Sequence, residues 1–292
     1  MLSRTRPLFA RGRLVALSLA LVCLSRSAHA QEWAKAALEK SPRHREYVAI
    51  QAGARTVTTF VVYPEVANKA PVVVMIHEIF GLSDWAKLMA DELAAKGYIV
   101  VEPDLLSGTN NAPQAPGNPA ASTTRGKGGT DSYGSTDAIV KAVSELPNEQ
   151  VMHDLDAVAD YGLKLPSANG KLAVAGFCWG GGKAFAFATH RKDLAAALVF
   201  YGPPPPADQM PAITAPVYGF YGEQDARIGA TLPATTATMK AAGRRYEPVV
   251  YAGAGHGFMR TGQEPGATPA NSKAWHDGFA RVQDILKSLP RD

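Results

Sequence analysis

The residues best suited to chemistry in this 292-residue sequence lie in the stretch 173–185, which reads AVAGFCWGGGKAF. Cys178 follows a short apolar run and stands between glycines at positions 176 and 180. This G-x-C-x-G pattern is typical of a nucleophile held on a sharp turn between a strand and a helix, where neighbouring side chains would crowd the backbone. A helix start would also favour the thiolate through its free N–H groups and its dipole. An isolated cysteine is otherwise a common buried hydrophobe.

A cysteine nucleophile requires a base, and the base requires an acid that orients it. The chain order nucleophile, acid, histidine is that of α/β-hydrolases. Asp225, in the stretch YGEQD, follows an expected strand and is the candidate acid, with Glu223 as its rival. His256 lies between two glycines in AGAGHGF and is the candidate base. The plainer alternatives are a helix-capping or surface acid and a surface histidine.

Two backbone N–H groups are needed to bind the oxyanion that such a reaction forms. In an α/β-hydrolase one comes from the loop after an early strand and the other from the residue after the nucleophile. The stretch VVVMIHEIFGL at 72–82 supplies that loop, so we expect the donors to be Ile79 and Trp179. The adjacent pair His77 and Glu78 lacks the second histidine of an H-E-x-x-H zinc motif, and no Cys/His cluster occurs, so we expect no metal and no cofactor.

The elements that must position these residues follow a regular pattern. From residue 57 onward, apolar β-branched runs alternate with helical patterns, which is typical of a mostly parallel sheet with helices on both faces. We expect strands at 57–63, 72–76, 99–102, 172–176, 195–201, 217–221 and 248–251. Ser83 can cap a helix ending near Gly97, Val151 marks a second, and the apolar side of the last helix, from Trp275 to Leu289, is assigned to the core. The sequence therefore predicts an α/β-hydrolase fold in a single domain over residues 31–292.

Residues 107–135 interrupt this pattern with glycine, proline, threonine and asparagine. A loop of this length is either a mobile connection or a functional lid, and the sequence favours neither. Its glycine-rich part, 126–129, lacks the strand-loop-helix frame and the Lys-Ser/Thr ending of a phosphate loop, which argues against nucleotide binding.

The first thirty residues have the features of an export signal. Arginines precede an apolar run at 14–24 and a small-residue stretch that ends at Ala30, so we expect a secretory signal peptide cleaved after that residue. The run is too short for a permanent membrane anchor. It holds five of the 30 Lys and Arg and none of the 26 Asp and Glu, so the remainder carries a formal net charge of −1 and offers no basic stripe for nucleic acid. Loss of Cys23 leaves Cys178 without a disulfide partner. We expect a secreted, preferably periplasmic, monomer.

From about residue 57 to 289 the chain resembles the dienelactone hydrolase family, the carboxymethylenebutenolidases. The stretches that carry the resemblance are HEIFGL, GFCWGG, GEQD and GHGFMR, in the order of the family. The resemblance implies an α/β-hydrolase fold and a triad of Cys178, His256 and Asp225. The export signal and the long loop are departures from the family, and they leave the natural substrate open.

The resemblance also implies roles for charged residues near the triad. Glu78 would pair with the resting thiol and help to release the thiolate when substrate arrives. Arg260, four residues after the candidate base, would bind a substrate carboxylate. Arg125 is a guess for a second arginine of this kind.

The expected reaction is metal-free hydrolysis of a carboxylic ester or lactone through a thioester acyl-enzyme. One alternative is a secreted esterase that acts on neutral esters and does not need Arg260. Another is a catalytically dead binding protein with the same fold. A thiol redox protein is disfavoured because a resolving cysteine is lacking. The expected partner is a small-molecule ester or lactone, with no nucleic acid and no membrane after signal cleavage.

Overall fold

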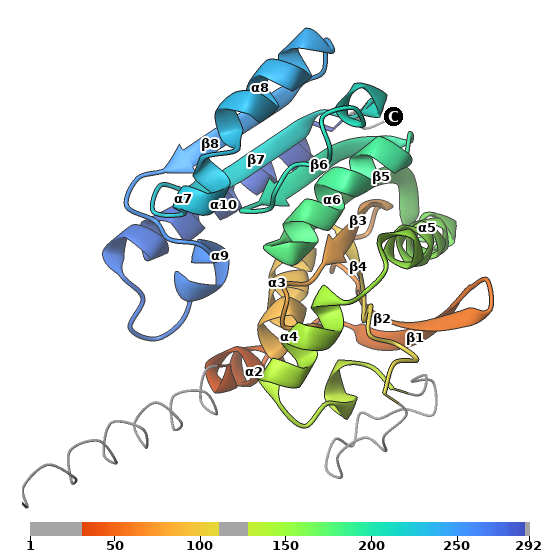
Figure 1. Ribbon diagram of the computed structural model, residues 1–292. Coiled ribbons are helices and arrows are strands. Elements are labelled where there is room, and N and C mark those ends of the chain that lie inside the picture. Colours follow the sequence, from red (N-terminus) through yellow and green to blue (C-terminus); the bar gives the residue numbers. More distant parts are fainter. Residues whose placement is uncertain (1–30, 111–127, 290–292) are drawn as a thin grey trace, which may run out of the picture.

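A single eight-stranded sheet forms the centre of the computed structural model, which describes residues 31–110 and 128–289 (Figure 1). Its strands are β1 (Arg45–Ala52), β2 (Arg55–Val62), β3 (Ala70–Ile76), β4 (Ile99–Pro103), β5 (Ala168–Phe177), β6 (Leu194–Phe200), β7 (Val217–Gly222) and β8 (Tyr246–Tyr251). The spatial order is β1-β2-β4-β3-β5-β6-β7-β8. β2 pairs antiparallel with β1 and β4, and the pairings from β4 to β8 are parallel. The expected mostly parallel sheet is confirmed.

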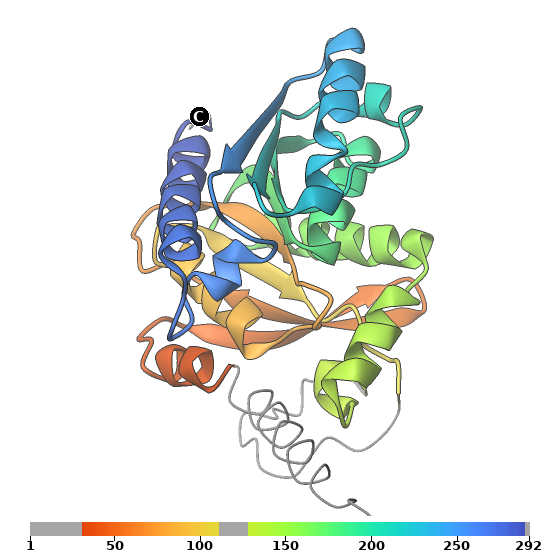
Figure 2. The same cartoon turned by 60° about the vertical axis from the view of Figure 1, so that its left-hand side comes forward.

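Helices cover both faces of this sheet (Figures 1 and 2). α2 (Glu32–Glu39), α3 (Asp84–Ala94) and α10 (Pro269–Lys287) lie on one face. α5 (Asn148–Lys164), α6 (Trp179–His190) and α8 (Leu232–Ala241) lie on the other. The connections contain α4 (Thr136–Ser144), α7 (Ala226–Gly229), α9 (Phe258–Thr261) and the 3-10 turns η1 (Thr130–Ser132) and η2 (Met210–Ala212). No helix of the described residues has the length and apolar character needed to cross a bilayer.

The sheet separates two apolar cores. In β3, Val73 and Met75 belong to the core under α3 and α10, whereas Val72 and Val74 belong to the core under α5 and α6. Because both faces are buried, the strand is apolar at every position instead of alternating. The last helix packs as expected, with Trp275, Phe279, Val282, Leu286 and Leu289 at the first of these cores.

Local signals explain where the elements begin. The side chain of Ser83 accepts a hydrogen bond from the backbone N–H of Ala86 and so caps α3, as expected. β1 was not expected from the sequence. Its first five residues are at most partly buried because β1 lies at the edge of the sheet, so REYVAIQA contains no long apolar run. The predicted signal peptide and most of the 107–135 loop, including Arg125, lie outside the described residues.

The parallel strands bring the candidate functional residues to one edge of the sheet. Glu78 follows the carboxyl end of β3, Cys178 follows β5, Asp225 follows β7 and His256 follows β8. In open α/β sheets this edge is where ligands bind. Residues up to 178 positions apart in the sequence can therefore form a single site.

Candidate active site

Cys178 occupies a strained turn between β5 and α6. Its φ and ψ angles are 57° and −115°, a conformation that non-glycine residues rarely adopt. The flanking glycines are sterically required, because a Cβ at Gly176 would lie 2.0 Å from the carbonyl oxygen of Gly180. A Cβ at Gly180 would lie 2.4 Å from the carbonyl oxygens of Ile76 and His77. The structure therefore has the nucleophile-elbow geometry that the G-x-C-x-G pattern predicts.

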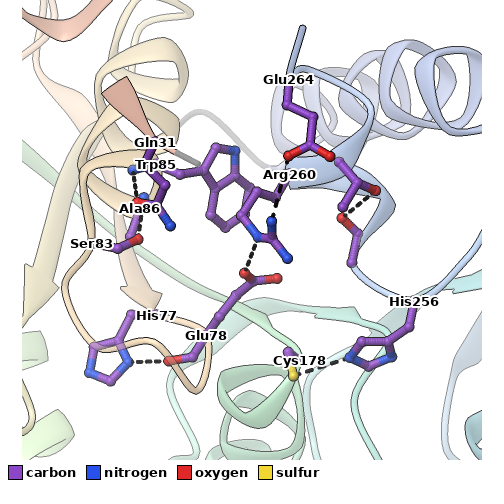
Figure 3. Close-up of polar contacts among 12 residues, drawn as sticks. Gln31, His77, Glu78, Ser83, Trp85, Ala86, Cys178, His256, Arg260 and Glu264 are labelled. Atoms are coloured by element: carbon purple, nitrogen blue, oxygen red, sulfur yellow. Dashed lines mark hydrogen bonds and ion pairs between the residues drawn. The ribbon is translucent and has the colours of Figure 1, made fainter. Parts of the chain in front are cut away.

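The imidazole of His256 lies against the cysteine sulfur (Figure 3). The distance from His256 Nε2 to Cys178 Sγ is 3.1 Å, and the thiol is partly exposed. On the other side of the ring, Nδ1 lies 2.5 Å from Asp225 Oδ2. A carboxylate can only accept, so Nδ1 carries the proton and Nε2 is free to accept the thiol proton. The three residues form a connected chain from carboxylate to sulfur.

Asp225 is held by its own loop as well as by the histidine. Its other oxygen, Oδ1, accepts a hydrogen bond from the backbone N–H of Ile228 and thereby caps α7. The rival acid, Glu223, is exposed and accepts a hydrogen bond from the backbone N–H of Gly253 instead. The geometry therefore selects Asp225 over Glu223 as the partner of His256.

The loop that carries His256 is fixed by a side chain that sequence reasoning did not identify. Asn271, near the start of α10, accepts a hydrogen bond from the backbone N–H of Gly255 and donates one to Thr261 Oγ1. Gly257 follows with a φ of 73°, in the left-handed region, and leads directly into α9. The turn between the two glycines thus directs the imidazole toward β5.

The two expected oxyanion donors lie at the sulfur. The backbone N–H groups of Ile79 and Trp179 hydrogen bond to Cys178 and lower the pKa of its thiol. Burial and the charge of Glu78 act in the opposite direction and prevail, so the pKa of Cys178 lies above its ordinary value. The Trp179 N–H group at the helix start favours the thiolate, as expected, but burial and Glu78 outweigh it. The resting cysteine is a thiol that lies beside the imidazole of His256.

Glu78 and Arg260 are paired with each other (Figure 3). Arg260 Nε donates to Glu78 Oε2 over 2.8 Å, and the hydroxyl of Tyr201 donates to Oε1 over 3.2 Å. Burial raises the pKa of Glu78, while Arg260 and Tyr201 oppose that rise. Within the described ranges the hydrogen bonds of the Glu78 carboxylate thus go to Arg260 and Tyr201, and only its charge acts on Cys178.

Tyr201 is a further site residue that sequence reasoning missed. It follows β6, is fully buried and has a φ of 40°. Its ring meets that of His256 edge-on at 5.0 Å between centroids. Tyrosine directly before the Gly202-Pro203 turn, at the carboxyl end of a buried strand, is the sequence signal that could have identified it.

His77 contacts the loop after β3 that carries the expected oxyanion donor Ile79. Its Nδ1 donates to the carbonyl oxygen of Glu78 over 2.7 Å, and its ring stacks on that of Trp179 at 5.7 Å. Burial lowers the pKa of His77, so the ring is neutral. Over residues 31–110 and 128–289, no group of three His, Cys, Asp or Glu side chains is arranged to hold a metal ion.

A cavity of about 450 Å³ opens beside Arg260 and Phe80. Its wall also includes Leu82 from the loop after β3 and Ile139 from α4. The guanidinium of Arg260 stacks over the Phe80 ring at 5.2 Å. The cavity therefore adjoins the Glu78 and Arg260 pair, at the same edge of the sheet as the cysteine.

Comparisons with known proteins agree with this fold. The model of the dienelactone hydrolase family matches residues 57–289. A Salmonella typhimurium protein named "Putative carboxymethylenebutenolidase" is 30% identical over 224 residues, which cover 73% of this chain and 75% of that protein. The crystal structure titled "Putative Dienelactone Hydrolase" from Klebsiella pneumoniae has a TM-score of 0.70 at 25% identity, covering 84% of this chain and 99% of the other. A dienelactone hydrolase from Anabaena variabilis, with a TM-score of 0.61 at 17% identity over 85% and 99% of the two chains, shares the fold.

Proposed function

The chain belongs to the dienelactone hydrolase family and is a hydrolase of carboxylic esters or lactones; on that premise we propose that Cys178 is its nucleophile and that the reaction passes through a thioester. The observation that carries the proposal is the chain of contacts from Asp225 through His256 to the sulfur, 2.5 Å and 3.1 Å long. Both contacts are within the range expected of a nucleophile, its base and the orienting acid.

The first half of the reaction transfers the acyl group to sulfur. His256 takes the thiol proton as Sγ attacks the substrate carbonyl, and the negative charge forms on the carbonyl oxygen. The N–H groups of Ile79 and Trp179, which act on the Cys178 sulfur, then bind that oxygen. Collapse of the intermediate breaks the bond to the alcohol oxygen, which takes the proton from His256 and leaves.

The second half releases the acid. A water molecule gives a proton to His256 and attacks the thioester carbonyl. The same two N–H groups bind the second oxyanion. When the carbon-sulfur bond breaks, the carboxylic product leaves and the sulfur recovers its proton. In a lactone the alcohol and the acyl group belong to one molecule, so the product is a hydroxy acid. When the lactone is an enol ester, the enol that is released converts to its keto tautomer.

The raised pKa of Cys178 suits this order of events. A thiol that is protonated at rest is less prone to oxidation than a free thiolate, because oxidation requires the ionised sulfur. The proton is removed only when His256 and an electrophilic carbonyl are both present. This behaviour is useful for an unpaired thiol in an oxidising compartment.

Export to such a compartment is part of the proposal. A signal peptide cleaved after Ala30 would make Gln31 the first residue of a periplasmic monomer. Gln31 already contacts the fold, since its side-chain oxygen accepts a hydrogen bond from the backbone N–H of Trp85. The intact mass of protein recovered from the periplasm, and its elution volume in gel filtration, test the cleavage site and the monomer.

Turnover of small aryl esters tests the nucleophile. With 4-nitrophenyl acetate we expect an initial burst of nitrophenol that iodoacetamide abolishes. Cys178→Ala should lose turnover by a factor of at least about 10³, the order seen when a catalytic nucleophile is removed. Retained turnover in a folded Cys178→Ala variant would refute the assignment.

A further inference from the structure

The arginine that the family resemblance assigns to a substrate carboxylate is already engaged. Arg260 Nε donates to Glu78, and Arg260 Nη1 lies 3.8 Å from a carboxylate oxygen of Glu264. Its guanidinium also stacks on Phe80. An anionic substrate group that binds Arg260 must therefore compete with two carboxylates of the protein for its charge.

A second arginine lies beside the candidate acid Asp225 and has no partner among the described residues. Arg227 is in α7, two residues after Asp225, at the carboxyl edge of the sheet. Its side chain is exposed, and its guanidinium has no hydrogen bond or ion pair within residues 31–110 and 128–289. Sequence reasoning did not single it out, because a lone arginine on a short helix has no motif of its own.

The position of Arg227 is fixed relative to the catalytic chain. Asp225 binds the backbone N–H of Ile228 through one oxygen and His256 through the other, so α7 is tied to the imidazole. The charge of Arg227 also lowers the pKa of the Cys178 thiol. Arg227 thus lies on the Asp225 side of the contacts to the sulfur, on an exposed part of α7, whereas Arg260 is paired with Glu78.

We propose that Arg227 binds an anionic group of the substrate, a carboxylate in the simplest case, while the scissile carbonyl lies at Cys178. An unpaired guanidinium offers up to five N–H donors and a planar fork that matches a carboxylate, and no carboxylate in the described part of the chain is paired with it. Arg227 is then a specificity-determining residue on the Asp225 side of the site, separate from Arg260. This inference rests on the proposed function, since it assumes that a carbonyl compound binds at Cys178.

Alkylation of the thiol separates this role from hydrolysis. Iodoacetate and iodoacetamide both react when the Cys178 sulfur bonds to their methylene carbon and iodide leaves, but only iodoacetate is an anion. Because both reagents react with the same thiolate, the ratio of their rates at one pH does not depend on the thiolate fraction. At low salt, Arg227→Gln should lower the iodoacetate to iodoacetamide ratio by about three- to fivefold, the Coulomb effect of one solvent-exposed charge. Arg227→Lys should keep most of the ratio.

Arg245 provides the matched control. It is exposed and directly precedes β8, at the amino end of that strand and therefore away from the carboxyl edge that carries the site. It is paired with Glu247. Arg245→Gln changes the net charge equally and should leave the ratio as in the wild type. An unchanged ratio in Arg227→Gln, or an equal fall in Arg245→Gln, would overturn the proposal.

Hydrolysis of a matched substrate pair gives the second readout. Mono-4-nitrophenyl glutarate and 4-nitrophenyl valerate have acyl chains of equal length and differ by one carboxylate. We expect Arg227→Gln to lower kcat/KM more for the glutarate than for the valerate, chiefly through KM. If wild-type protein alkylates normally but hydrolyses neither ester, the proposed function fails. If the wild type hydrolyses both esters and Arg227→Gln leaves the ratio of kcat/KM for the glutarate to that for the valerate unchanged, this inference alone fails.

Discussion

The carboxylate of Glu78 lies 2.8 Å from Arg260 Nε, and its charge nevertheless raises the pKa of the Cys178 thiol. The ion pair places a negative charge close to Cys178, although Glu78 receives no hydrogen bond from the thiol. The protonation of Cys178 therefore depends on a residue that does not contact it through a hydrogen bond. Each charged group around the sulfur has a predictable effect on the pH at which the thiol reacts.

Glu78→Gln should make the thiol ionise at lower pH. The pKa of Cys178 is raised by burial first and by Glu78 second, so loss of the negative charge leaves a smaller rise. The pH profile of inactivation by iodoacetamide should move to lower pH in the variant. A profile that stays in place or moves to higher pH would show that Glu78 does not control this thiol.

Tyr201→Phe should impair positioning of Glu78 with little loss of packing. The variant removes the hydroxyl that donates to Glu78 Oε1 but keeps the buried ring against His256. We expect a cost of about 1.5–3 kcal/mol in the free energy of unfolding, the range for a hydrogen bond to a charged group, and a fall in kcat larger than the change in KM. Urea unfolding and ester kinetics measure the two effects. Unchanged kcat would remove Tyr201 from the site.

Gly180→Ala should damage both stability and activity. The added Cβ would lie 2.4 Å from two carbonyl oxygens of the β3 end, so the strand, the elbow or both must shift. A loss of about 2–4 kcal/mol in unfolding free energy is expected for such overpacking. Gly134→Ala is the control, because a Cβ there meets nothing within 4 Å. Equal stability of the two variants would contradict the steric account of the elbow.

Glu102→Gln should become more stable relative to the wild type as the pH rises. Glu102 is fully buried in β4, and neither carboxylate oxygen has a hydrogen-bond partner among the described residues, so burial raises its pKa well above the ordinary value of 4.5. The folded protein therefore holds this proton more tightly than the unfolded chain, and stability is lost as pH rises from 4.5 toward the folded pKa. The variant should lack that loss, and chemical denaturation at pH 4 and pH 8 measures the difference. A wild type and variant with the same pH dependence would contradict this assignment.

The sequence predicted most of the sheet because buried parallel strands are apolar at every position, and it predicted the elbow because its glycines are required sterically. It did not predict β1, whose edge position leaves little apolar pattern. Asn271 was missed for a different reason, since its partners Gly255 and Thr261 lie 16 and 10 residues away, a spacing that matches no local motif. The pairing of Arg260 with Glu78 depends on the relative placement of β3 and α9, which no local pattern encodes.

The most direct test of the account is the identity of the acylated residue. The protein is mixed with 4-nitrophenyl acetate, quenched in acid within the burst phase and digested, and the peptides are analysed by mass spectrometry. The account predicts one acetyl group on Cys178, which hydroxylamine at neutral pH removes as expected of a thioester. Acetylation of another residue, or full turnover with an unmodified Cys178 throughout the burst, would contradict it.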